Sequence, residues 1–201
     1  YGRESDVIYP PVDIDKFNIS SLAPSRPQRD GQNSKFYLVV SRLVPYKKVD
    51  LVIKVFNKLG WNLKIIGVGS ELRKLKRMAK SNIDFLGQLT DEQLISYYQN
   101  CRAVIFAQEE DFGLVPLEAQ ACGKPVIAFR AGGAAETIKD RITGVFFDQQ
   151  TPESLIEAVK KADLMIKNSK LKPEDCRKQA EKFGMKKFLA KFKQIAEENG
   201  R

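Results

Sequence analysis

Apolar residues along the chain gather in short runs, and most runs are followed by a segment with apolar residues at helical spacing. The run Phe36–Val40 is apolar throughout, which is typical of a strand buried between two layers. Residues 48–59 then carry apolar side chains three and four positions apart, for example Val49 and Val52. This alternation predicts a strand followed by an amphipathic helix.

The same pattern continues to the end of the chain. Further strands are predicted at 61–66, 83–86, 103–107, 125–129 and 144–147. Further helices are predicted at 70–80, 90–100, 114–122 and 151–166, and residues 173–198 read as two helices broken at Gly184. Two helix starts carry recognisable caps: a Thr90…Gln93 capping box, and Thr151 followed by Pro152.

Strands that are apolar on both faces and alternate with helices indicate a doubly wound parallel α/β sheet. We expect one domain over residues 1–201, with an N-terminal segment and surface loop at 1–35, the α/β core at 36–170 and C-terminal helices at 171–201. Ligands of such sheets bind beyond the carboxyl ends of the strands. The loops after residues 41, 66, 86, 107 and 129 are therefore the places to look for function.

Composition narrows the chemistry. The 201 residues carry a net charge of +9, which suits nucleic acid, an anionic membrane face or a phosphate-bearing small molecule. The chain has no His, so it cannot supply an imidazole base or a His metal ligand. Three Cys without a CxxC spacing indicate neither a disulfide framework nor a zinc site, and a reducing cytosol fits them.

The loop after residues 103–107 is acidic and runs into a helix. The first N–H groups of that helix, near Gly113, Leu114 and Val115, have no partner within the helix and form a ready phosphate site at the ligand edge. Glu110 lies before the helix and Glu118 one turn into it, so both could face one ligand. The alternative is that the acidic residues only complement the helix dipole.

The loop after the first strand is basic instead. Arg42 and Lys47 stand on a Pro-containing turn, where fixed cations could balance the charge of a diphosphate leaving group. The alternative is a solvated basic turn. Gly67 and Gly69 could let the backbone approach a ligand after the second strand, although a lone GxG of this kind is also a common turn.

Taken together, these loops resemble the donor domain of glycosyltransferase family 4, in the family's order and with roughly its spacing. The Glu-x7-Glu element in its Phe-Gly context is the specific part, and the likeness covers about residues 7–198. The matching segments are 41–47, 67–69, 85–87, 110–119 and 123–128. Val68 departs from the family, which usually has Asp in the Gly-x-Gly turn.

The resemblance implies a Rossmann-like domain that forms the C-terminal half of a GT-B glycosyltransferase, with roles for individual residues. Arg42 and Lys47 would bind the donor diphosphate, and Gly67, Gly69 and Leu86 would border the nucleotide. Glu110 would be the catalytic residue at the transferred sugar. Phe112, Gly113 and Leu114 would donate backbone N–H groups, and Glu118 would accept the ribose hydroxyls.

The implied function is retaining transfer of a hexose, with mannose expected, from a nucleoside-diphosphate sugar such as GDP-mannose to a glycan or lipid-linked acceptor. The resemblance implies no metal or other cofactor, a cytoplasmic location that allows peripheral membrane contact, and an N-terminal acceptor-binding domain that this chain lacks. Without that domain we expect no transfer. Two alternatives remain at this point: a basic nucleic-acid-binding module, and a nucleotide-sugar epimerase-like domain.

Overall fold

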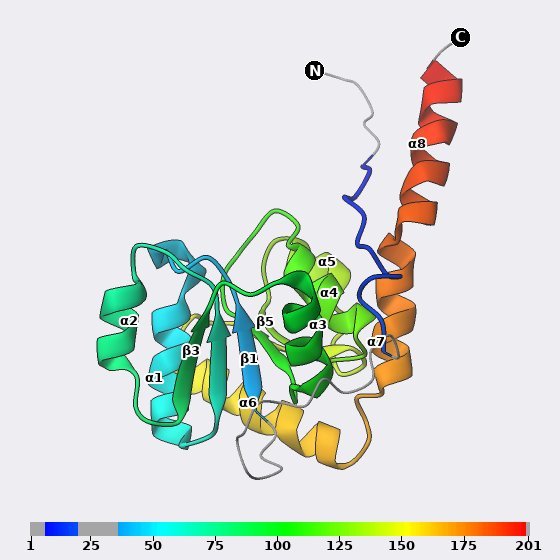
Figure 1. Ribbon diagram of the computed structural model, residues 1–201. Helices are drawn as coiled ribbons and strands as arrows, with labels where there is room; N and C mark the ends of the chain where they lie inside the picture. The colour runs from blue at the N-terminus through cyan, green and yellow to red at the C-terminus, as the bar shows by residue number, and fades with distance from the viewer. Residues whose placement is uncertain (1–6, 20–35, 200–201) are drawn as a thin grey trace.

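The computed structural model describes residues 7–19 and 36–199. Within them, six parallel strands form one sheet in the order β3-β2-β1-β4-β5-β6 (Figure 1). The strands are β1 (Tyr37–Val40), β2 (Leu63–Ile66), β3 (Ile83–Gly87), β4 (Val104–Phe106), β5 (Val126–Phe129) and β6 (Gly144–Phe147).

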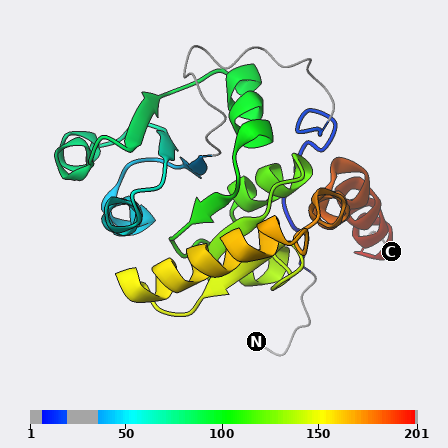
Figure 2. The same cartoon turned by 90° about the horizontal axis from the view of Figure 1, so that it is seen from below.

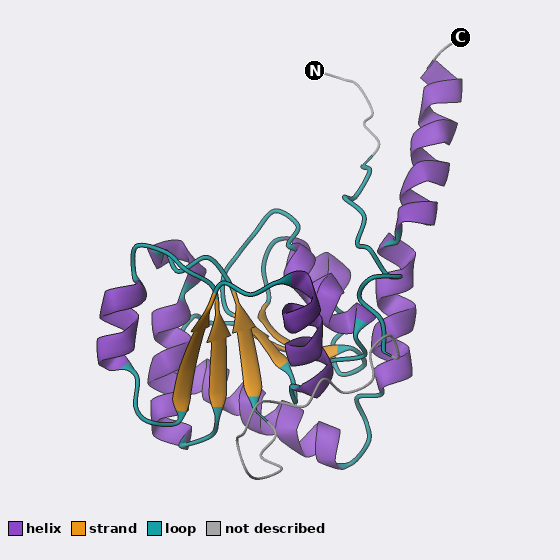
Figure 3. Cartoon of the chain, in the orientation of Figure 1, coloured by secondary structure: helices purple, strands orange, loops and turns teal. Residues whose placement is uncertain are grey.

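Helices connect successive strands and cover both faces of the sheet (Figure 3). They are α1 (Val49–Leu59), α2 (Leu72–Met78), α3 (Asp91–Asn100), α4 (Leu114–Ala121), α5 (Gly133–Thr137), α6 (Pro152–Lys167), α7 (Pro173–Ala180) and α8 (Met185–Asn199). None of the helices in the described residues is long and apolar enough to cross a membrane.

Each face of the sheet has its own hydrophobic core, as alternating strand side chains require. Tyr37 and Val39 point into the layer made by α1, α2 and α6, whereas Leu38 points into the layer made by α3, α4, α5 and α7. The two layers lie on opposite sides of the strands when the molecule is seen from below (Figure 2). The predicted doubly wound α/β fold is therefore confirmed.

Most predicted elements are present with ends shifted by one to three residues. The Thr90 cap is confirmed: its hydroxyl accepts from the Gln93 backbone N–H, and the Gln93 side chain accepts from the Thr90 N–H. Helix α5 was not predicted. The predicted surface loop lies almost wholly outside the described residues, at 20–35.

The strand order has one functional consequence. The chain moves outward from β1 to β3 and then returns to start β4 on the other side of β1. Loops that leave neighbouring strands in opposite directions open a crevice between them, and such switch points are where open α/β sheets bind ligands. Here the switch point lies between the ends of β1 and β4.

Candidate functional site

A cavity of about 230 Å³ lies at this switch point. It brings together Arg42 and Lys47 from the loop after β1 with Glu110 from the loop after β4, three residues that the sequence singled out. The full lining is Val40, Ser41, Arg42, Tyr46, Lys47, Gln108, Glu110 and Val115. The basic loop and the acidic loop are therefore two walls of one site.

Lys47 and Glu110 form an ion pair across that cavity, with side chains only 12% and 23% exposed. The Lys47 ammonium also lies 4.9 Å from the centroid of the Tyr46 ring. Burial, and then the neighbouring charge of Arg42, lower the pKa of Lys47. The Glu110 carboxylate thus balances the charge of the Lys47 ammonium.

The backbone around Gly113 is shaped for close approach. Gly113 precedes the first residue of α4 with φ of 80°, and a Cβ there would lie 2.9 Å from the ring of Phe106. The N–H groups of the first turn, from Leu114 onward, have no acceptor within the helix. The Phe112 side chain faces elsewhere, stacked 5.2 Å from the ring of Tyr9, so only its backbone remains free for the predicted contact.

Glu118 lies one turn further along α4, on the side that faces α3. Its Oε2 accepts a 2.8 Å hydrogen bond from the hydroxyl of Tyr98. Burial raises the pKa of Glu118, and the Tyr98 hydrogen bond opposes that rise. Leu86, at the end of β3, packs against the same layer, so the two residues predicted to meet the nucleoside share one face of the sheet.

Gly67 and Gly69 hold two loops together. A Cβ on Gly67 would lie 1.9 Å from the Ser41 carbonyl oxygen, and one on Gly69 would lie 2.2 Å from the Leu43 carbonyl oxygen. The Ser41 and Leu43 N–H groups donate to the carbonyls of Ile66 and Val68 at 3.0 and 2.9 Å. These contacts explain both glycines, while their predicted contact with a donor remains a prediction.

Three features of the site were not predicted. Gly133 donates a 2.9 Å hydrogen bond to the Glu110 carbonyl, and a Cβ on Gly132 would lie 2.1 Å from the same oxygen. The Gly-Gly pair thus contacts the backbone of the acidic loop directly. Tyr98 has no sequence signal that separates it from other core aromatic residues, whereas Gln108 directly follows a strand and is nevertheless buried.

The arrangement suits an anionic, sugar-bearing ligand. Arg42, Lys47 and the N-terminus of α4 lie at the same edge of the sheet. The carboxylates of Glu110 and Glu118 can accept hydrogen bonds from hydroxyl groups. Among the residues described, no group of three or more Cys, Asp or Glu side chains is placed to hold a metal ion. Fold and geometry together define a Rossmann-like domain with a cavity at its switch point that is lined by two cations and one carboxylate.

Comparison with known proteins identifies the family. Residues 25–183 match the glycosyl transferases group 1 family, and the chain belongs to that family. An uncharacterised glycosyltransferase of Methanocaldococcus jannaschii is 30% identical over 171 residues, which are 81% of this chain and 48% of the relative. A GDP-mannose-dependent phosphatidylinositol monomannoside mannosyltransferase of Mycolicibacterium smegmatis is 34% identical over 172 residues, 75% of this chain and 44% of the relative.

Solved structures agree on the fold. A Rickettsia africae glycosyltransferase superposes with a TM-score of 0.85 at 24% identity, over 96% of this chain and 56% of that one. Anabaena HepE, solved with UDP and glucose, gives 0.82 at 23% identity, over 97% and 56%. The chain thus spans about half the length of these relatives. They favour neither the nucleic-acid-binding nor the epimerase alternative.

Proposed function

We propose that this chain is the donor-binding half of a retaining glycosyltransferase that moves a hexose from a nucleoside-diphosphate sugar to a glycan or lipid-linked acceptor. One observation carries the proposal: Arg42, Lys47 and Glu110 meet at the β1–β4 switch point, beside the start of α4. Mannose is the sugar we propose, supported by the GDP-mannose-dependent relative at 34% identity.

Each wall of the site has its own task in this proposal. The cations Arg42 and Lys47, with the N–H groups of Gly113 and Leu114, stabilise the diphosphate as its negative charge grows during bond cleavage. Glu110 then exchanges its bond to Lys47 for the hydroxyls of the sugar. Because protein cations supply the positive charge, we propose that the diphosphate binds without a divalent metal.

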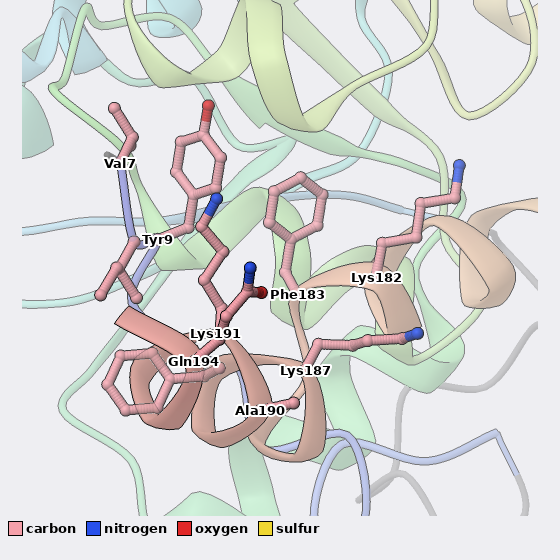
Figure 4. Close-up of a pocket in the computed structure, with 10 residues that line it drawn as sticks. Val7, Tyr9, Lys182, Phe183, Lys187, Ala190, Lys191 and Gln194 are labelled. Atoms are coloured by element: carbon pink, nitrogen blue, oxygen red, sulfur yellow. The ribbon is translucent and has the colours of Figure 1, made fainter. Parts of the chain in front are cut away.

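The rest of the enzyme would attach beside the N-terminal segment and α8. Both extend past the sheet on the side where the strands end (Figure 1). Between them lies a cavity of about 340 Å³, and its lining includes Tyr9, Phe183 and Lys187 (Figure 4). Leu189 and Phe192 leave more than half of their side chains exposed. A second domain seated here would face the donor edge and supply the acceptor wall.

A panel of nucleotides tests the proposal. Calorimetry of the chain with UDP, GDP and ADP should show binding of at least one, unchanged by EDTA. Loss of all binding in EDTA would contradict the metal-free site, and no binding of any of the three in any buffer would contradict the donor-site assignment.

The two glutamates should separate by role in the same assay. Glu110→Gln frees Lys47, so nucleoside diphosphate affinity should hold or rise, while sugar transfer by the full-length enzyme should fall by roughly 100-fold or more, as for other lost transition-state contacts. Glu118→Gln should weaken nucleotide binding whether or not a sugar is attached. Equal effects of both variants on both ligands would rule out these assignments.

A further inference from the structure

Tyr98 is a buried polar residue that the proposed mechanism leaves unused. It lies on α3 with its side chain fully buried, and its hydroxyl donates 2.8 Å to Oε2 of Glu118 on α4. A buried phenol needs a partner, and here the partner is the carboxylate assigned to the ribose. This bond joins the two helices that flank the nucleoside end of the site.

We propose that Tyr98 is a positioning residue for nucleotide binding: it holds one carboxylate oxygen of Glu118 so that the other is left to accept the ribose hydroxyls. The inference rests on the proposed function, because it takes Glu118 as the ribose acceptor. An ionised carboxylate can accept several hydrogen bonds, so one bond to Tyr98 does not exhaust it.

The surroundings of Tyr98 fix its hydroxyl. The ring packs edge-on against Phe17 at 6.0 Å, and the backbone carbonyl of Tyr98 accepts from the Cys101 thiol at 3.2 Å. Burial and the Glu118 charge keep the pKa of Tyr98 well above its usual value, so the phenol stays protonated and remains a donor. A carboxylate held in this way loses less freedom when ligand binds.

Charge at Glu118 also depends on this bond. Burial favours the neutral acid and so does Asp91 on α3, whereas Tyr98 and the more distant Lys16 favour the carboxylate. Cys122, the residue directly after α4, is a buried thiol, and burial raises its pKa to about 12, so it stays uncharged. Removing the Tyr98 hydroxyl should therefore raise the pKa of Glu118 further and weaken it as an acceptor.

The test compares binding of nucleotides that carry the 2′ and 3′ ribose hydroxyls with binding of analogues that lack both. Isothermal titration of this chain uses UDP and GDP, each beside its 2′,3′-dideoxy analogue. Tyr98→Phe should weaken binding of the ribonucleotide about tenfold, the usual order for one hydrogen bond to a charged group, and leave the dideoxy analogue unchanged. The ribose-dependent loss should also be larger at low pH than at high pH, because removal of the Tyr98 hydrogen bond favours the neutral form of Glu118.

Tyr97→Phe is the matched control. Tyr97 is the preceding residue on α3, and its ring packs edge-on against Phe36 at 5.9 Å, whereas the bond to Glu118 comes from Tyr98. Loss of the Tyr97 hydroxyl should change neither affinity. Equal weakening of ribo- and dideoxynucleotide by Tyr98→Phe, or no weakening at all, would overturn the positioning role while the parent still binds. A parent chain that binds neither nucleotide would overturn the proposed function and this inference with it.

Discussion

At the scale of single residues, the ion pair between Lys47 and Glu110 neutralises two charges of opposite sign within the site. Neither side chain is much exposed, so each would lose favourable interactions if the other were removed. A diphosphate brings negative charge of its own and can replace the carboxylate beside Lys47.

The cations are predicted to carry phosphate affinity. Arg42→Ala and Lys47→Ala should each weaken UDP or GDP binding by roughly 1.5–3 kcal/mol, the range for hydrogen bonds to charged groups, and by less at high salt. Lys193→Ala removes the same charge from an exposed position on α8 and is the control. Titration calorimetry measures all three. If the control weakens binding as much as the others, only net charge matters.

We predict that the buried Glu118 carboxylate lowers the stability of the folded chain while it serves nucleotide binding. Burial raises the pKa of Glu118 in the folded state above its value in the unfolded state, so the folded state binds the proton more tightly. The free energy of unfolding therefore falls as pH rises from the unfolded-state pKa to the folded-state pKa. Glu118→Gln removes that cost and should raise Tm at pH 7, by about 2–4 °C for each ~1 kcal/mol gained, with the gain shrinking towards pH 4.

Differential scanning fluorimetry between pH 4 and 8 follows this effect. Glu157→Gln, on an exposed position of α6, is the matched change, and the difference between its Tm and that of the parent should stay near zero across the range. A Glu118→Gln variant that loses stability at pH 7, or gains it equally at every pH, would show that burial does not govern this carboxyl.

The sequence could predict some of these residues and not others, for a physical reason. Arg42, Lys47 and Glu110 are polar residues in loops directly after apolar runs, and such a position is informative because strand ends meet at one edge. Tyr98 sits in an amphipathic helix, where a tyrosine looks like any other core aromatic. Its role depends on a partner 20 residues away, which only the packing of α3 on α4 reveals.

At the scale of elements, the spacing of apolar residues predicted a helix correctly where the segment was several turns long. Helices such as α1 and α6 span several turns, and their apolar stripes are plain. Helix α5 has five residues, GAAET, which is too short for a stripe and begins with a glycine that usually marks a loop. Helix α2 ended earlier than predicted because Ala79 is extended, with ψ of 139°.

The missed helix α5 leads to a prediction, since its first residue supports the acidic loop. A Cβ on Gly133 would lie 2.2 Å from the Phe112 Cα, so Gly133→Ala should push that loop outward. We expect a loss of roughly 1–3 kcal/mol in stability, as for other overpacked sites, together with weaker diphosphate binding.

Gly60→Ala separates the two effects. Gly60 ends α1 with φ of 68° and has open space around it, so alanine there should cost a comparable ~1–2 kcal/mol through the backbone alone. Its diphosphate affinity should match the parent. Denaturant unfolding and calorimetry measure both quantities, and unchanged binding in Gly133→Ala would mean that the acidic loop tolerates displacement.

At the scale of the whole molecule, the proposed function makes this chain one wall of a cleft. Transfer needs the donor sugar held against an acceptor hydroxyl with water kept out, and a single wall does neither. We therefore predict that the 201 residues bind a nucleoside diphosphate but transfer no sugar. Labelled GDP-mannose with a lipid-linked acceptor, given to this chain and to the full-length protein, checks this. Transfer at similar rates by both would refute it.

Charge and length gave less guidance at this scale. The net charge of +9 suited three classes of partner, and only the placement of Arg42 and Lys47 at the switch point favours one of them. The relation of the N-terminal segment to α8 was also out of reach, since it depends on a long-range contact: the Val12 N–H donates to the Phe183 carbonyl at 2.9 Å.

The join between β1 and β4 also bears on how the molecule folds. These two strands share one register pair, Leu38 with Val104, whereas β1 and β2 share four, and β5 and β6 share four. The first three strands and the last three are thus each continuous in sequence and meet along their shortest ladder. A nucleotide at the switch point would contact both β1–β3 and β4–β6 and so stabilise the packing of one half against the other. A ligand present at 100 times its Kd raises the free energy of unfolding by about 2.7 kcal/mol. Amide hydrogen exchange should therefore become slower in both halves of the sheet when the nucleotide is bound.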